Sequence, residues 1–266
     1  MKIGAALLVA FVAIVLLWQF WKGDTAASKA LLQTADRAYF AGEKAEGINE
    51  RKEKFNTALQ NYLQLEKTFH PREGNGRLDF NTANALFQLE QYPLSIYYYY
   101  RAKGLRPRDV RVQHNLEVAL QKAKVATKPE TSVFQQIFAW HFWLSQPERL
   151  QLFSILTFLL FALLSVQFWK PHPTVKSVLI FTAIAWACVM GSLLYSRFVE
   201  PIEGVLVRAT SLYRDAGLQF AKVQENPILG GSKVEVLDTV KNGEWVWIKT
   251  PEGTLGYVPS EAIRVI

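Results

Sequence analysis

The hydrophobic pattern of the chain contains three long apolar runs, separated by mixed and more polar stretches. Residues 3–20 form the first run, and residues 150–169 and 177–196 form two later runs without any charged side chain. A bilayer core of roughly 30 Å requires about 20 helical residues, which both later runs supply. Aromatic residues near their ends are typical of membrane interfaces. Ser145-Gln-Pro-Glu148 predicts a capping box that begins the first of these two helices. We predict transmembrane helices over 150–169 and 177–196, with a buried hairpin of a soluble protein as the alternative.

The N-terminal segment, residues 1–21, is either a signal anchor or a signal peptide. A cleaved signal peptide has an apolar core of about 7–15 residues followed by small residues, and residues 25–27 could supply the cleavage site. The core here is longer and ends in aromatic residues between Trp18 and Trp21, which suits an interfacial anchor. We favour an uncleaved third transmembrane helix, and cleavage stays open.

The loop between the two later runs, residues 170–176, carries Lys170 and Lys176. Short loops rich in lysine and arginine remain in the cytoplasm. We therefore expect this loop to be cytoplasmic and the regions on either side of the pair of helices to face the opposite compartment.

Residues 25–125 have a helical pattern with an internal repeat. A shift of 34 residues, the tetratricopeptide period, superimposes Arg77 on Arg111 and Asn81 on Asn115. This segment resembles a tetratricopeptide-repeat module, with a diverged repeat before it and a closing helix over residues 110–124.

Several residues fit the positions at which two helices of such a repeat meet. Ala83 and Ala102 allow close approach, Tyr99 fills the interface, and Pro107 ends the second helix. Residues 126–149 would then form an amphipathic juxtamembrane linker.

One polar stripe of the helical module is a candidate peptide-binding groove, because the resemblance implies that this face is concave. Amide side chains can hydrogen-bond a peptide backbone, and arginines can bind carboxylates. Ordinary solvated faces and hydrogen bonds between helices are the alternatives. The candidate residues are Arg77, Asn81, Asn84, Gln88, Arg111 and Asn115.

Residues 204–266 change to short alternating runs interrupted by glycine and asparagine, a pattern that predicts a small antiparallel barrel. Asn242-Gly243 and Pro251-Glu-Gly253 mark tight connections between strands. The stretch GEWVWIKTPEGTLGYVPSEAI resembles a bacterial SH3-like domain. The fold class is thus a multi-domain membrane protein with a helical module, three transmembrane helices and an all-β SH3-like barrel.

The tryptophan strand of this barrel alternates between two faces. We expect Val246 and Ile248 in the core and the two tryptophans partly exposed. Packing of both tryptophans is the alternative to a ligand-binding role, and Ala262 stands where the related groove usually has a second tyrosine. The candidate surface consists of Trp245, Trp247, Tyr257 and Pro259.

Composition narrows the function classes further. The 266 residues are 50% hydrophobic and 20% charged, which excludes a disordered chain, and the net charge of +7 is not concentrated as in a nucleic-acid binder. One cysteine and four scattered histidines provide no metal-ligand motif. There is no P-loop, dinucleotide fingerprint, HExxH or GxSxG motif. We predict no catalytic residues, no metal and no cofactor.

The order of the modules resembles the BatE family of bacterial aerotolerance operons over essentially the whole chain. The stretch ALFQLEQYPLSIYYYYRAKGLRPRDVRVQHNLEVA and the barrel motif carry most of the likeness. The resemblance implies a scaffold in the bacterial inner membrane, with von Willebrand A-domain membrane proteins and an associated AAA+ ATPase as partners. Aerotolerance is a phenotype, and these residues indicate no oxygen chemistry.

The resulting hypothesis is a non-enzymatic adaptor in the inner (cytoplasmic) membrane, with both soluble modules periplasmic or extracytoplasmic. Its partners would be proteins and the lipid bilayer, without nucleic acid. A cell-envelope sensor that binds peptidoglycan through the SH3-like domain is one alternative, and an accessory subunit of a membrane enzyme is another.

Overall fold

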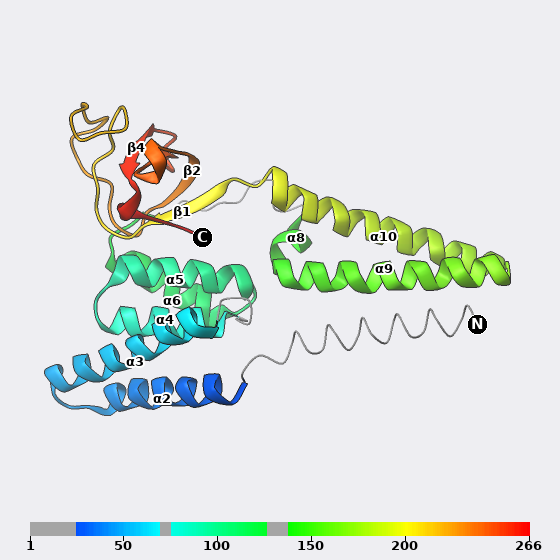
Figure 1. The fold of residues 1–266 in the computed structure, drawn as a ribbon, viewed down its shortest axis with the longest axis horizontal. Helices are drawn as coiled ribbons and strands as arrows, with labels where there is room; N and C mark the ends of the chain where they lie inside the picture. Colours follow the sequence, from blue (N-terminus) through cyan, green and yellow to red (C-terminus); the bar gives the residue numbers. More distant parts are fainter. Residues whose placement is uncertain (1–24, 70–75, 127–137) are drawn as a thin grey trace. The chain divides into compact units, whose positions relative to one another are not determined.

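The computed structural model describes residues 25–69, 76–126 and 138–266 (Figure 1). Contacts along the chain divide it into two compact units, residues 1–74 and 75–266. The predicted N-terminal span and part of the predicted juxtamembrane linker lie outside the described residues.

The first unit contains a helical hairpin of α2 (Thr25–Lys44) and α3 (Ile48–Phe69). Phe55 and Tyr62 are buried between the two helices, and the Tyr62 hydroxyl donates a 2.7 Å hydrogen bond to Asp36 Oδ1. A Cβ atom at Gly42 would lie 2.9 Å from the Phe55 ring. The absence of a side chain at Gly42 therefore allows the helices to pack closely around that ring.

The second unit begins with three helices: α4 (Arg77–Gln88), α5 (Tyr92–Leu105) and α6 (Val110–Lys122). Ala83 and Tyr99 are buried in their shared core, and the Ser95 hydroxyl donates a 2.9 Å hydrogen bond to the carbonyl oxygen of Ala83. The helix predicted over residues 110–124 is present as α6. The small and aromatic positions of the sequence thus lie at the interface between the helices.

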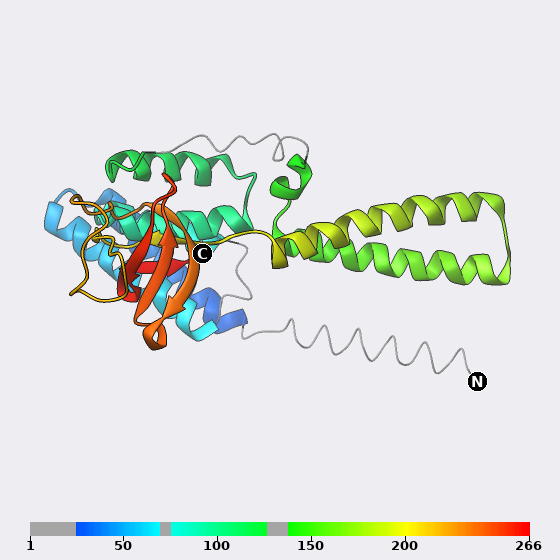
Figure 2. The same ribbon diagram turned by 90° about the horizontal axis from the view of Figure 1, so that it is seen from above.

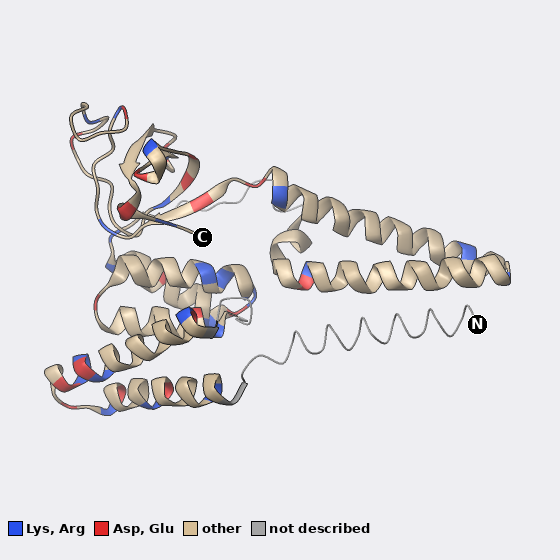
Figure 3. Ribbon diagram, in the orientation of Figure 1, with Lys and Arg blue, Asp and Glu red and all other residues tan. Residues whose placement is uncertain are grey.

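Next come a short helix and two long ones: α8 (Ala139–Trp143), α9 (Gln146–Trp169) and α10 (Pro173–Phe198). Helices α9 and α10 are long and apolar enough to cross a membrane, and they lie side by side in both views (Figures 1 and 2). The charges on this hairpin gather at its two ends (Figure 3).

The ends of the long helices confirm one local prediction and correct another. Ser145 and Glu148 form the predicted capping box, in which the Ser145 amide donates to Glu148 Oε2 at 2.8 Å. The loop predicted over 170–176 is shorter, because α10 begins at Pro173. Proline fits the first turn of a helix, where its missing N–H has no intrahelical acceptor, so it starts α10 rather than extending the loop.

The C-terminal part of the second unit is a five-stranded antiparallel sheet with the order β4-β3-β2-β1-β5. Both predicted tight connections join neighbouring strands, and Asn242 and Gly243 in the first have positive φ values of 56° and 88°. The alternation correctly placed Val246 and Ile248 in the core. The strands are β1 (Ile202–Leu206), β2 (Lys233–Val240), β3 (Trp245–Lys249), β4 (Leu255–Pro259) and β5 (Ile263–Val265).

Within the second unit, the sheet shares a core with the helices. Val205 of β1 belongs to the same buried cluster as Ile96 and Leu116. Gly231 has φ of 95°, and a Cβ atom there would lie 2.6 Å from Ile96 Cδ1. The glycine pair Gly230-Gly231 is therefore a point of close packing against α5.

Candidate binding surfaces

The predicted groove of the helical module converges at two of its amides. Asn84 lies on α4 and Asn115 on α6, and Asn115 Nδ2 donates a 3.0 Å hydrogen bond to Asn84 Oδ1. The Tyr99 hydroxyl donates to the same oxygen at 2.6 Å. Hydrogen bonds between helices, one of the alternatives to a peptide groove, are therefore present at these residues. Asn84 Nδ2 and Asn115 Oδ1 take no part in them. The other α4 candidates, Arg77, Asn81 and Gln88, share that helix with Asn84.

Arg111, the last candidate of this groove, binds the N-terminal cap of its own helix. Asp109 accepts hydrogen bonds from Arg111 Nε at 3.2 Å, from its terminal nitrogen at 3.1 Å and from its backbone amide at 3.1 Å. Arg106 donates to the same carboxylate at 2.6 Å. The hydrogen bonds from Arg111, joined by those from Arg106, lower the pKa of Asp109 from 3.8 to about 2.

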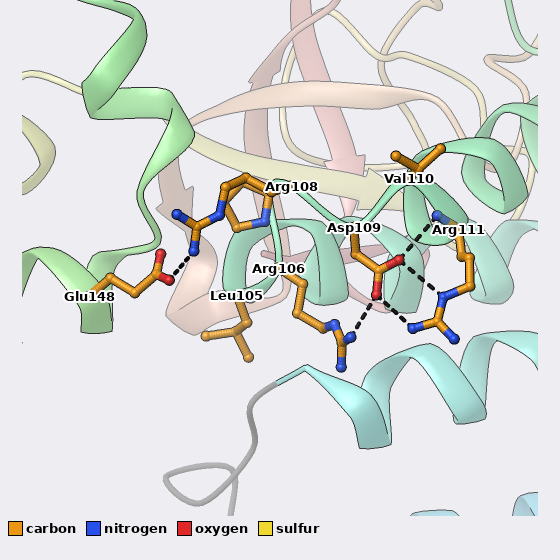
Figure 4. Close-up of a pocket in the computed structure, with 8 residues that line it drawn as sticks. Leu105, Arg106, Arg108, Asp109, Val110, Arg111 and Glu148 are labelled. Atoms are coloured by element: carbon orange, nitrogen blue, oxygen red, sulfur yellow. Dashed lines mark hydrogen bonds and ion pairs between the residues drawn. The ribbon is translucent and has the colours of Figure 1, made fainter.

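A shallow, open hollow of about 590 Å³ lies beside these arginines (Figure 4). Arg108 forms an ion pair with Glu148, from the first turn of α9. The Arg108 guanidinium also lies 4.7 Å from the centroid of the Trp143 ring. The hollow is therefore built by the connection between α5 and α6 together with the start of the apolar hairpin. Its lining residues are Leu105, Arg106, Pro107, Arg108, Asp109, Val110, Arg111 and Glu148.

The candidate surface on the sheet is assembled by the pairing of β3 with β4. Trp245 lies opposite Pro259, and Trp247 lies opposite Tyr257. Residues opposite each other in neighbouring strands project from the same face, so the register brings all four predicted residues together. The Trp247 and Tyr257 rings are stacked, with centroids 6.2 Å apart and planes 18° apart.

The expectation that both tryptophans are partly exposed is wrong for one of them. Trp245 is only 8% exposed, while Trp247 is half-buried. The Tyr213 ring packs edge-on against Trp245 with centroids 5.5 Å apart. Tyr213 comes from the long connection between β1 and β2, so the alternation within β3 could not reveal this cover.

A buried polar cluster at the open end of the hairpin was not predicted from the sequence. Arg149 of α9 donates from one terminal nitrogen to His141 Nδ1 at 2.9 Å, to Ser192 Oγ at 3.0 Å and to Ser196 Oγ at 2.8 Å. His141 Nε2 lies 2.7 Å from Glu200 Oε1. Because a guanidinium only donates, His141 Nδ1 accepts, and the Nε2 hydrogen is directed to Glu200.

The electrostatics of this cluster favour a charged carboxylate. Burial alone would raise the pKa of Glu200, but hydrogen bonds from His141 and Ser196, with the charge of Arg149, give a net downward shift. Arg149 is 6% exposed, and its Nε has no hydrogen-bond partner within the described part of the chain. The cluster joins α8, α9 and α10 through the hydrogen bonds of one terminal nitrogen of Arg149 and the contact of His141 with Glu200.

The sequence carried only a weak signal for this cluster. Arg149 comes one residue before the predicted span, so the span itself contains no charge. Ser192 and Ser196 are spaced four residues apart on one face of α10, and this polar pair in an apolar helix is the signal that could have been noticed.

Two residue types that bear on metal or redox chemistry are also placed. In the described ranges, no three His, Cys, Asp or Glu side chains are grouped so that they could hold a metal ion. Cys188 is a free, exposed cysteine on α10.

In its described residues the chain is mostly helical, with a five-stranded antiparallel sheet and two helices that are candidates for crossing a membrane. No family model and no curated protein matches the chain.

Proposed function

We propose that the chain is a non-enzymatic scaffold of a bacterial inner membrane with two binding modules, a tetratricopeptide-like helical module and an SH3-like sheet. The observation that carries the proposal is that α4 and α6 bring Asn84 and Asn115 of the stripe within 3.0 Å, while Asn84 Nδ2 and Asn115 Oδ1 take no part in the bond that joins them. Asn115 follows Asn81 by the repeat period, so a stripe repeated in sequence converges in space. Such a stripe suits the recognition of an extended peptide segment.

The partners in this proposal are membrane proteins with von Willebrand A domains, as the resemblance to the BatE family suggests. The hairpin of α9 and α10 would cross the membrane twice, which returns the chain to the same side. Strand β1 and helices α4–α6 share one buried core. The sheet and these helices must therefore lie in the same compartment, which fits a hairpin that crosses the membrane twice.

Affinity purification from membranes tests the groove. The double variant Asn81→Ala/Gln88→Ala should recover about tenfold less partner, since the few residues whose truncation costs more than about 1 kcal/mol cluster near the centre of an interface. The matched control Glu117→Ala/Gln121→Ala removes two exposed side chains from α6 and should leave recovery unchanged. Equal recovery with both folded variants would refute the groove.

Labelling of engineered cysteines in a Cys188→Ser background tests the topology. Gln121→Cys and Glu252→Cys should react with an impermeant reagent in intact cells. His172→Cys, in the turn of the hairpin, should react only after permeabilisation. Opposite accessibility of Gln121→Cys and Glu252→Cys would refute the shared compartment.

The stacked, half-buried pair of Trp247 and Tyr257 favours a second candidate function, binding of peptidoglycan by the SH3-like surface. Aromatic rings provide a flat surface for a sugar or peptide group. The full chain in detergent should sediment with purified cell wall, and Trp247→Ala should weaken this. Failure of the unaltered protein to sediment would exclude the candidate.

A further inference from the structure

The open hollow beside Arg108 lies where the apolar surface of the hairpin begins. Glu148 lines the hollow, and Leu150, two residues later on α9, is a large exposed apolar side chain. At a rise of 1.5 Å per residue, the two positions are about 3 Å apart along the helix. If α9 enters a bilayer at Leu150, the hollow is at the level of the lipid headgroups.

The aromatic side chains of the neighbouring segment fit the same level. Phe138, Phe142 and Trp143 are all exposed. Between them, His141 is buried in the polar cluster with Glu200, which fixes α8 to the hairpin. Exposed tryptophan and phenylalanine beside a transmembrane segment are typical of the interfacial region. The apolar lipid-facing surface thus continues from α9 onto α8, next to the hollow.

The charges of the hollow favour an anion. Three guanidinium groups share two carboxylates, since Arg106 and Arg111 both bind Asp109 and Arg108 binds Glu148. Each guanidinium has five N–H donors, of which these pairs occupy only some. The Arg108 side chain is 40% exposed and that of Arg106 24%, so both can be reached from solvent. A phosphate group is an acceptor that such donors bind bidentately.

We propose that this hollow binds the phosphate headgroup of an anionic phospholipid in the leaflet where α9 begins. Arg108 and Arg106 hold the phosphate, while Trp143 and Phe142 lie among the upper acyl-chain atoms. Glu148 competes with the phosphate for Arg108. Loss of the Arg108 charge should therefore weaken lipid binding, and loss of the Glu148 charge should strengthen it. An ion pair with a purely structural role would not produce these opposite effects.

The test titrates the purified full chain, in an uncharged detergent, with short-chain phosphatidylglycerol and follows bound lipid by native mass spectrometry. Phosphatidylcholine and inorganic phosphate are parallel arms. We expect saturable binding of phosphatidylglycerol only, weakened by added salt. Phosphatidylcholine carries the same phosphate together with a choline cation, so its equal binding would show that the site does not select an anionic lipid. Equal competition by inorganic phosphate at the same concentration would show a general anion site instead. Either result overturns the proposal.

Variants give the sharper measurement. An arginine near a membrane surface contributes about fivefold to anionic-lipid binding, so Arg106→Gln/Arg108→Gln should weaken binding by roughly 25-fold. Glu148→Gln should strengthen binding by about fivefold, and glutamine still suits the capping box with Ser145. The charge-matched control Arg214→Gln/Lys222→Gln, on exposed positions of the sheet unit, should have no effect.

Two results would refute the site. One is unchanged binding by the double arginine variant with an unaltered circular dichroism spectrum. The other is weaker lipid binding by Glu148→Gln. If the ion pair only maintained the local structure, removal of either of its two charges would weaken binding. Neither variant changes Asn81 or Gln88, so recovery of protein partners through the groove remains a separate measurement.

Discussion

The sheet and the hairpin of α9 and α10 contain similar apolar residues. The sheet buries them in its core, whereas the hairpin exposes them on its surface. In the sheet, Leu206, Ile248 and Val258 are completely buried. In the hairpin, Phe158 is 78% exposed and Phe161 73%. Burial of apolar surface stabilises a fold in water, whereas a helix in lipid gains nothing from hiding such side chains. The sheet therefore has the core of a fold that is stable in water, whereas the hairpin has the exposed apolar surface of a candidate membrane-crossing pair.

Polar side chains show the reverse arrangement. The hairpin buries Arg149, Thr182 and Ser192 between or beside its helices. In a bilayer, polar groups are costly unless they find partners within the protein. The hydrogen bonds of Arg149 to His141 and Ser192 provide such partners.

The largest expected effect comes from breaking this polar cluster. Arg149→Met leaves His141 and Glu200 without their cationic partner, and removal of one member of a buried charge network costs about 3–5 kcal/mol. The unfolding of the full chain in detergent should show this loss. Arg197→Met, at an exposed position near the end of α10, is the control and should change little. Unchanged or increased stability of Arg149→Met would contradict a stabilising role for the cluster.

The same apolar substitution in the two regions compares them directly. Ile248→Ala in the sheet removes a completely buried side chain and should cost about 2–5 kcal/mol. Ile155→Ala on α9 removes a side chain that is 63% exposed, and it should have a small effect on unfolding in detergent. Similar losses in both variants would mean that Ile155 is covered by protein, and the contrast between the regions would fail.

A pair of glycine substitutions examines the contact between the sheet and α5. Gly231→Ala places a methyl group 2.6 Å from Ile96 Cδ1 on a backbone with positive φ, and we expect a loss of about 2–4 kcal/mol. Gly243 also has positive φ, but nothing lies within 4 Å of its Cβ position. Gly243→Ala should therefore lose only the free energy of the strained backbone, about 1 kcal/mol, without a packing clash. Equal losses, measured by thermal unfolding, would argue against close packing at Gly231.

The smallest expected effect concerns pH. Since the pKa of Asp109 falls from 3.8 to about 2 on folding, its contribution is fully present above pH 4 and is lost as pH falls through 2. For an exposed ion pair we expect less than about 1 kcal/mol. The stability difference between the unaltered chain and Asp109→Asn should therefore shrink between pH 4 and pH 2. A difference that is constant over this range would exclude the ionised carboxylate as its cause.

Much of the fold could be predicted because local patterns specify it. The apolar runs predicted α9 and α10, the capping box predicted the start of α9, and alternation predicted the core positions of β3. Strands β1 and β5 were not predicted: they are short, and their hydrogen-bonding partners lie far away in the chain. For the candidate surfaces, the register confirmed that Trp247 and Tyr257 lie together, while their ligand stays a prediction.

The sequence by itself determined the two long apolar helices, the alternation within β3 and the stretches that avoid charge, because these properties depend on neighbours within a few residues. Only the tertiary structure decided that Tyr213 covers Trp245, that Gly231 packs on Ile96, and that Arg149 meets His141. Each of these contacts joins residues distant in the chain. Its formation depends on packing and hydrogen-bond geometry, which the periodicity of a single segment does not contain.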